Sequence, residues 1–97
     1  MITLHWTERA QDDLAATHAF IGGDSPAFAT VVVRRLIAAV DLLRDFPQLG
    51  RMVEEFPDPT IREIVRPPNR IVYRILSDEV IHIITIHHSA RGPIGTL

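Results

Sequence analysis

The chain has 97 residues, of which 46% are hydrophobic and 23% charged, and its formal net charge is −2. A chain of this length buries roughly 60–65% of its unfolded surface, which suffices for one core without disulfides or metal, so we expect one domain over residues 1–97. The absence of cysteine excludes a thiol nucleophile and a Cys-based zinc site. No signal-peptide pattern opens the chain and no apolar run reaches the ~20 residues of a membrane span, so we expect a cytoplasmic protein without membrane contact.

Charge is unevenly distributed along the chain. All ten basic residues are arginine; residues 1–58 carry a net charge of −4, and residues 59–97 carry +2. Nucleic-acid binding rewards many phosphate contacts, so a net-acidic chain is a poor general binder of DNA or RNA. The sequence leaves open the alternative of a local basic face formed by the second half of the chain.

The first half predicts a short strand followed by a helical hairpin. Residues 1–6 alternate and are partly β-branched, which is typical of an edge strand. Residues 7–45 have two runs of helical periodicity, with Thr7 and Ser25 as N-caps and Pro26 at the first position of the second helix. The apolar stripe of the second helix consists of Phe28, Val32, Leu36, Val40 and Leu43.

The second half predicts an antiparallel meander. Residues 46–60 are rich in proline and acids and indicate a surface connection, residues 61–88 contain three runs rich in Ile and Val, and residues 89–97 form a tail without periodicity. The expected order is therefore β-α-α-β-β-β. This order predicts an α+β domain in which a helical hairpin packs on one face of a small antiparallel sheet.

Strand parity predicts which face carries the arginines of the meander. If residues 67–69 form the turn and Arg66 pairs with Arg70, then Arg62 lies opposite Arg74 and all four point from one face. If Leu76 pairs with Val80, His82 lies opposite Arg74, and Ile84 and Ile86 join Val72 on the arginine face. The other, more apolar face, with Ile61, Val65, Ile71, Tyr73, Ile75, Ile81, Ile83, Thr85 and His87, should be the one that the helices cover. A one-residue slip would turn Arg62 and Arg66 to that covered face, and the sequence leaves this alternative open.

Five motifs resemble those of the ParE/RelE toxin superfamily. They are Trp6-Thr7-x-x-Ala10-x-x-Asp13-Leu14, Phe46-Pro47-x-Leu49-Gly50-Arg51-x-Val53, Arg62-Glu63-Ile64, Arg70-Ile71-Val72-Tyr73-Arg74-Ile75 and Ile86-His87-His88-x-x-Arg91. Each motif is weak alone, but the five occur in order and at the usual spacing across residues 6–91. The fold that this resemblance implies is the β-α-α-β-β-β arrangement.

The resemblance implies the toxin of a type II toxin–antitoxin pair. Such a toxin is held inactive by a cognate antitoxin, a small DNA-binding protein whose C-terminal segment wraps over it. ParE-like members poison DNA gyrase, whereas RelE-like members cleave messenger RNA on the ribosome. We expect the neighbouring gene to encode the antitoxin, and we expect the antitoxin to cover an apolar groove between the helical hairpin and the sheet.

The resemblance places this chain nearer the ParE branch. For a RelE-like, metal-independent endoribonuclease it would assign catalytic roles to Arg62, Arg70, His88 and Arg91. RelE-like members use a tyrosine near the C-terminus, but no tyrosine follows Tyr73 here, and lysine is absent. We therefore expect a gyrase poison, with the ribonuclease and a non-toxic binding module of the same fold as alternatives.

The candidate target-binding residues are arginines of the meander and the tail. They are Arg62, Arg66, Arg70, Arg74 and Arg91. No metal or cofactor is expected, because the neighbouring His87 and His88 would face opposite sides of a strand and no other ligand spacing supports a metal site. Arg34 and Arg35 are expected to be solvated charges on the second helix.

Overall fold

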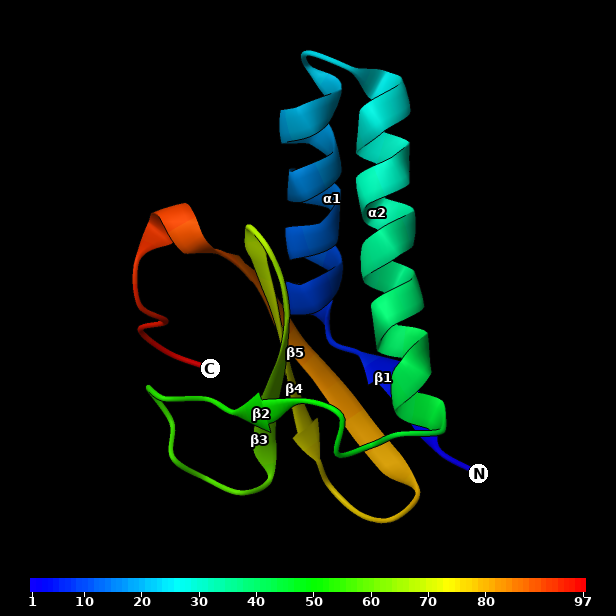
Figure 1. Cartoon of the computed structure of the whole chain (residues 1–97), viewed down its shortest axis with the longest axis vertical. Coiled ribbons are helices and arrows are strands. Elements are labelled where there is room, and N and C mark those ends of the chain that lie inside the picture. Colours follow the sequence, from blue (N-terminus) through cyan, green and yellow to red (C-terminus); the bar gives the residue numbers. More distant parts are fainter.

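The computed structural model describes residues 1–97 and has two layers, a helical hairpin and a five-stranded sheet (Figure 1). The elements are β1 (Thr3–Trp6), α1 (Glu8–Gly22), α2 (Pro26–Asp41), the 3₁₀ helix η1 (Leu42–Arg44), β2 (Arg51–Met52), β3 (Ile61–Arg66), β4 (Asn69–Ile75), β5 (Val80–His88) and the 3₁₀ helix η2 (Ser89–Arg91). The strand order is β1-β5-β4-β3-β2. None of the helices combines the length and the apolar character that crossing a membrane requires.

The predicted fold class is confirmed, and the sheet differs from the prediction in the direction of one strand and in one additional strand. Strand β1 lies at an edge as expected, but it runs parallel to β5, so the sheet is mixed. The short strand β2 forms within the predicted connection and pairs antiparallel with β3 at the other edge. A parallel partner for β1 requires a long crossover, which the helical hairpin supplies.

Both predicted helix caps are confirmed. The Thr7 hydroxyl oxygen accepts a hydrogen bond from the Ala10 N–H at 3.1 Å and donates one to the Ile83 carbonyl at 2.8 Å. The Ser25 side chain accepts from the Phe28 N–H at 3.2 Å. Each cap satisfies an N–H that the first helical turn leaves without an intrahelical partner. Thr7 also ties the start of α1 to strand β5, which lies between β1 and β4.

The helices cover one face of the sheet and enclose the main core. Its fully or nearly fully buried members are Ala10, Leu36, Ala39, Val40, Leu43, Ile64, Ile71, Tyr73, Ile81, Ile83 and Ile86. Asp13 fastens α1 to β5 at the border of this core, because its carboxylate accepts hydrogen bonds from the Thr85 hydroxyl and the Ile86 N–H.

A smaller core lies on the opposite face. It consists of Val53, Ile61, Val72 and Ile94, which are at most 4% exposed. The segment after β2 and the C-terminal tail contribute Val53 and Ile94, so these two irregular segments cover part of the face that the helices leave open (Figure 1).

The predicted same-face register of the arginines is wrong by one residue. Arg66 pairs with Asn69, Arg62 with Tyr73 and Ile61 with Arg74, because Pro67 and Pro68 alone form the turn. Arg62 and Arg66 therefore lie on the helix side of the sheet, and Arg70 and Arg74 on the other side. This register places Ile64 opposite Ile71 in the main core and avoids pairing arginines directly opposite each other.

A β-bulge changes the parity of β5 as well. Arg74 pairs with His82 as predicted, but the register shifts between Val72 and Tyr73. Beyond the shift, Ile86 lies opposite Ile71 and His87 opposite Arg70. The sequence placed Ile86 with the arginines and His87 under the helices, and both assignments are wrong because the extra residue reverses the alternation.

Tyr73 links the sheet to the segment between η1 and β2. Its side chain is fully buried, as expected. The hydroxyl donates a hydrogen bond to the Pro47 carbonyl at 2.9 Å and accepts one from the Gly50 N–H at 2.9 Å. Burial raises the pKa of this phenol, which keeps it in the neutral form that can donate.

Removal of the Tyr73 hydroxyl should destabilise the fold. Tyr73→Phe would leave the Gly50 N–H and the Pro47 carbonyl without their partner, so we expect a loss of about 1–3 kcal/mol in the free energy of unfolding. Urea titration followed by circular dichroism measures it. Thr30→Ala, which removes an exposed hydroxyl from α2, should cost less than about 0.5 kcal/mol. An equal loss of unfolding free energy in Tyr73→Phe and Thr30→Ala would contradict the structural role of the Tyr73 hydroxyl.

A side chain at position 50 should also be destabilising. A Cβ there would lie 2.6 Å from the Glu63 carbonyl oxygen and 2.8 Å from the Tyr73 ring and hydroxyl. We expect Gly50→Ala to cost about 1–3 kcal/mol in urea unfolding, because backbone and a buried ring would have to move. Gly95→Ala is the matched control, since its added Cβ meets nothing within 4 Å. A Gly50→Ala variant as stable as the control would show that this packing is not tight.

Candidate functional site

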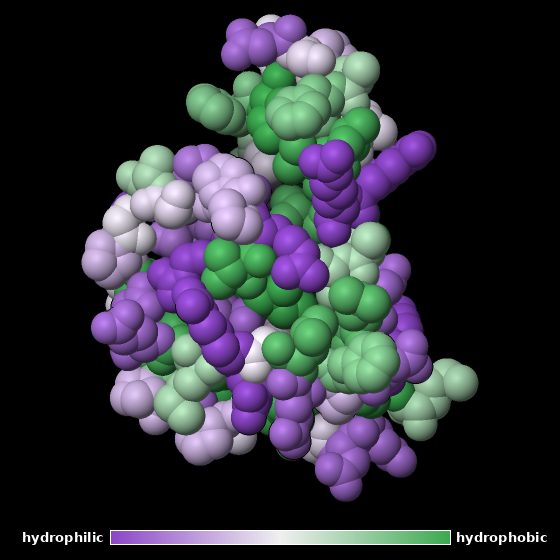
Figure 2. Space-filling model, viewed as in Figure 1, coloured by the Kyte–Doolittle hydropathy of each residue, from purple (hydrophilic) through white to green (hydrophobic).

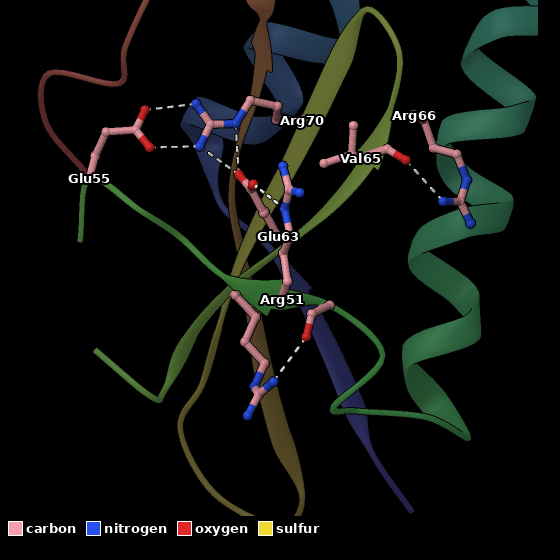
Figure 3. A network of polar contacts seen from close by, with 8 residues as sticks. Arg51, Glu55, Glu63, Val65, Arg66 and Arg70 are labelled. Atoms are coloured by element: carbon pink, nitrogen blue, oxygen red, sulfur yellow. Dashed lines mark hydrogen bonds and ion pairs between the residues drawn. The ribbon is translucent and has the colours of Figure 1, made fainter. Parts of the chain in front are cut away.

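Arg70, a candidate on the basis of sequence, is held by two carboxylates (Figure 3). Its two terminal nitrogens donate to the two oxygens of Glu55 at 2.7 and 2.8 Å. Its Nε donates to Glu63 at 2.7 Å, and Nη2 lies 2.6 Å from the same Glu63 oxygen. Bidentate guanidinium–carboxylate pairs are among the stronger hydrogen-bonded contacts in proteins. The positive charge of Arg70 is therefore matched within the molecule.

Glu63 is the most buried carboxylate of this network. It is 3% exposed and accepts a second arginine, because the Arg51 Nε donates to its other oxygen at 2.9 Å. A buried carboxylate is tolerated when it is paired and hydrogen-bonded. Its cross-strand neighbour on β4 is Val72, so Glu63 lies on the face of the sheet that the helices leave open.

The network lines a cleft of about 720 Å³ next to the C-terminal tail, which we call the polar cleft. Its charged lining consists of two arginines and three glutamates, namely Arg51, Arg70, Glu54, Glu55 and Glu63. The side-chain charge of the cleft is thus negative. A phosphate group would meet carboxylates here as readily as guanidinium groups.

The pKa values follow from this pairing. Hydrogen bonds from Arg70 and, to a smaller extent, from the Ile94 N–H lower the pKa of the Glu55 carboxyl to about 2, against the opposing effect of burial. The pKa of Arg70 is raised, mainly by its hydrogen bonds to Glu55. The Ile94 N–H donates to Glu55 at 2.9 Å, so the same carboxylate also fastens the tail.

Arg62 of β3 and Arg74 of β4 lie on opposite faces of the sheet. Arg62 donates to the Gly50 carbonyl at 2.9 Å and lies on the side of Tyr73, away from Arg70. Arg74 lies across from His82, whose ring centroid is 4.8 Å from that of His5. The four nuclease candidates therefore do not share one surface, since Arg62 and Arg70 point from opposite faces of the sheet.

The histidines at the end of β5 have structural partners. The His87 Nε2 lies 2.7 Å from the Gly92 carbonyl oxygen, and the ring is 7% exposed. The His88 Nδ1 accepts a hydrogen bond from the Ala90 N–H at 3.0 Å and so caps η2. Arg91, at the end of η2, is largely exposed, with an Asp13 oxygen 3.9 Å away.

A second cavity of about 900 Å³ lies between the helical hairpin and the β3–β4 turn, and we call it the hairpin groove. Both helices extend beyond the sheet at this end of the molecule (Figure 1), and Figure 2 shows apolar surface over the projecting hairpin with strongly hydrophilic side chains beside it. The apolar lining from the two helices consists of Ala16, Phe20, Ile21, Phe28, Val32 and Leu36. Phe20 is 81% exposed and Phe28 53% exposed, so the predicted apolar groove is present.

The rim of the hairpin groove contains Arg66 and Arg91 from the predicted set, together with Arg35 and His88. Figure 3 shows Arg66 extending toward α2, on the other side of the sheet from Arg70. The sequence had assigned Arg35 to solvent and gave no role to Asn69, which is 3% exposed and lines the same groove. Neither residue belongs to a sequence motif, so only their position at the hairpin groove identifies them as candidate binding residues.

The pairing of Glu55 predicts a specific acid sensitivity. A carboxyl whose pKa is lowered from 4.5 to about 2 contributes stability that is present above pH 4.5 and is lost as the pH falls toward 2. Glu55→Gln should lower the free energy of unfolding by about 1–3 kcal/mol at pH 7, and this difference should shrink below pH 4.5. Urea titrations between pH 7 and pH 3 measure it.

Glu54→Gln is the matched control for this experiment. Glu54 is the exposed neighbour of Glu55, so its replacement should leave the stability of the protein nearly unchanged at every pH. If the difference between the wild type and Glu55→Gln stayed constant down to pH 3, the assignment of the acid-sensitive pair would be wrong.

Comparison with known proteins identifies the family. Residues 4–93 match the family model described as the ParE toxin of the type II toxin–antitoxin system parDE. The chain is 36% identical to Toxin RelE2 of Caulobacter vibrioides over 91 residues, which cover 94% of this chain and 99% of the relative. It is 34% identical to the Putative toxin Y4kP of Sinorhizobium fredii over 88 residues, which cover 89% of this chain and 86% of that one.

A solved structure shares the fold. A chain of the chromosomal ParDE toxin–antitoxin system from P. aeruginosa superimposes with a TM-score of 0.71 at 24% identity, covering 91% of this chain and 96% of that chain. The family match spans both helices, β2 to β5 and all but the first residue of β1, so the resemblance found in the five sequence motifs is confirmed. This chain belongs to the ParE toxin family of type II toxin–antitoxin systems.

Proposed function

We propose that this toxin acts in the ParE manner, by binding DNA gyrase and blocking its function, and that a cognate antitoxin neutralises it. The observation that carries the proposal is the pairing of Arg70 with Glu55 and Glu63. An arginine that stabilises a phosphorane must offer its N–H groups to the reacting phosphate. Here all three guanidinium nitrogens already bind carboxylates, which favours a toxin that acts by binding its target and not by cleaving RNA.

The separation of the nuclease candidates supports the same proposal. Cleavage of RNA needs a base, an acid and a phosphate-binding group within reach of one reacting atom. Arg70 lines the polar cleft, His88 and Arg91 line the hairpin groove, and Arg62 binds the Gly50 carbonyl. No tyrosine follows Tyr73 in the chain. These residues are therefore better suited to contact a partner surface than to act together on one phosphate.

Cleavage of messenger RNA is the second candidate function. The 36% identity to the relative named Toxin RelE2 is the observation that supports it. A binding module of this fold that has lost toxicity is the third reading. The experiment that separates these three functions tests the purified toxin against gyrase and against ribosomes.

The first arm measures supercoiling by purified gyrase, and the second measures cleavage of a message on translating ribosomes. We expect loss of supercoiling and an intact message, because Arg70 is bound to two carboxylates and Arg62 points from the opposite face of the sheet. The chain with Arg66→Ala and Arg91→Ala combined should lose inhibition of gyrase by about tenfold or more, since both arginines are exposed and line the hairpin groove.

Arg34→Ala is the control, because Arg34 is an exposed arginine on α2 that does not line the hairpin groove. Cleaved message with normal supercoiling would replace the proposal with the ribonuclease reading. A protein that is inert in both arms and in a growth assay would be the non-toxic module.

A further inference from the structure

Two histidines near one edge of the sheet lie outside both sites described above. His5 of β1 and His82 of β5 occupy directly opposed positions in the parallel ladder that joins these strands (Figure 1). Neither residue lines the polar cleft or the hairpin groove. The centroids of the two imidazole rings are 4.8 Å apart, and the ring planes are inclined by 49°. The parallel pairing of β1 with β5 therefore brings together two metal-ligating side chains that are distant in the sequence.

The two imidazoles point away from the helices and have no hydrogen-bond partner within the protein. The residues on either side of each histidine along its strand pack in or against the main core, so alternation places both histidines on the face that the helices leave open. His87 and His88, in contrast, contact backbone groups through a ring nitrogen. His5 is exposed and His82 is half-buried. The ring nitrogens of His5 and His82 are therefore available to a ligand from solution.

The separation of the rings fits two imidazoles that share one metal ion. A Zn–N bond to histidine is about 2.0–2.1 Å long, and the ring centroid lies about 1.1 Å behind the nitrogen, so the ion lies about 3.2 Å from each centroid. Two rings that meet at an ion with an N–Zn–N angle of about 90–110° then have centroids about 4.5–5.2 Å apart. The 4.8 Å between the rings of His5 and His82 lies within this range.

The ligand set selects the kind of ion. Imidazole nitrogen suits Zn²⁺, Cu²⁺ and Ni²⁺, whereas Mg²⁺ and Ca²⁺ prefer oxygen ligands. The protein contains no group of three or more His, Cys, Asp or Glu side chains placed to hold one ion. A closed structural site with four protein ligands is thus excluded. An ion at His5 and His82 would keep its remaining coordination positions open to water.

Arg74 is the charged residue on the β4 side of this pair. It lies opposite His82 on the neighbouring strand and on the same face of the sheet. Asp58 is close enough to offset part of this charge, because the pKa of the Asp58 carboxyl is lowered mainly by hydrogen bonds from Thr60 and, to a smaller extent, by Arg74. A guanidinium group beside the histidines opposes the binding of a cation. The histidine pair should therefore bind a divalent ion more tightly when this arginine is removed.

We propose that His5 and His82 form a two-histidine site for a divalent transition metal ion such as Zn²⁺, and that the bound ion clamps the edge strand β1 to β5. Strand β1 has four residues and one neighbour in the sheet, so its pairing is among the parts of the fold that open most easily. An ion that binds only when the two strands are paired stabilises that pairing by mass action. The inference does not rest on the proposed function, since it uses neither Arg66 nor Arg91.

The test is a titration of the full chain, without a histidine tag, with Zn²⁺ in an isothermal calorimeter. We expect one ion per chain, and no binding of Mg²⁺ or Ca²⁺ at the same concentrations. His5→Gln and His82→Gln should each weaken Zn²⁺ binding by about tenfold or more, since the loss of even an indirect contact to a metal site has an effect of that size. His18→Gln is the matched control, because His18 is an exposed histidine on α1, and its replacement should leave the affinity nearly unchanged.

Two further measurements test the site by other routes. Arg74→Gln should tighten Zn²⁺ binding, because it removes a positive charge beside His82, and a substitution that merely damaged the fold would not have this effect. Amide hydrogen exchange of residues 3–7 should slow when Zn²⁺ is added to the wild type, and it should not change in His5→Gln. Circular dichroism of every variant shows whether the fold is retained.

The outcomes that would overturn the proposal are specific. Equal affinity of His5→Gln and the wild type for Zn²⁺ would contradict the site, as would an equal loss of affinity in His18→Gln. Binding that is lost in His88→Gln but kept in His5→Gln would place the ion at the other end of β5. Zn²⁺ binding at His5 that leaves the amide exchange of β1 unchanged would refute the clamp. The gyrase assay is separate, so the failure of the proposed function would leave this site standing.

Discussion

The two-residue turn at Pro67 and Pro68 fixes the register of β3 against β4, and this register divides the arginines between the two faces of the sheet. With Arg66 opposite Asn69, Glu63 points to the same side as Arg70, and the two bind each other. A shift by one residue would turn Glu63 into the core beside Tyr73 and leave a carboxylate there without its arginines. The ion-pair network and the position of the smaller core both depend on this one turn.

The register gives the toxin two surfaces of different electrostatic character. On the face away from the helices, Glu55 and Glu63 neutralise Arg70, and Glu55 also binds the tail through the Ile94 N–H. On the helix side, Arg66 reaches the hairpin groove, where no carboxylate is part of the lining. Charges that are paired within the protein are not available to a partner, whereas charges left exposed beside an apolar floor are. The proposed function follows from this division.

Much of the fold could be predicted from the chain, and the candidate site could be predicted only in part. The caps at Thr7 and Ser25, the helical hairpin and the buried Tyr73 follow from local rules of spacing and capping, and the structure confirms them. The parallel pairing of β1 and the bulge in β5 depend on contacts distant in sequence, which local patterns do not encode. For this reason the faces assigned to Ile86 and His87 were wrong.

The sequence by itself determined the fold class, the family and the arginine-rich meander, because periodicity, caps and motif spacing are local properties of the chain. Only the tertiary structure decided which arginines are free. Whether Arg70 meets a carboxylate or solvent depends on where Glu55 and Glu63 come to lie, and these belong to different segments of the chain. The recruitment of Arg35 and Asn69 to the hairpin groove likewise requires α2 to pack beside the β3–β4 turn.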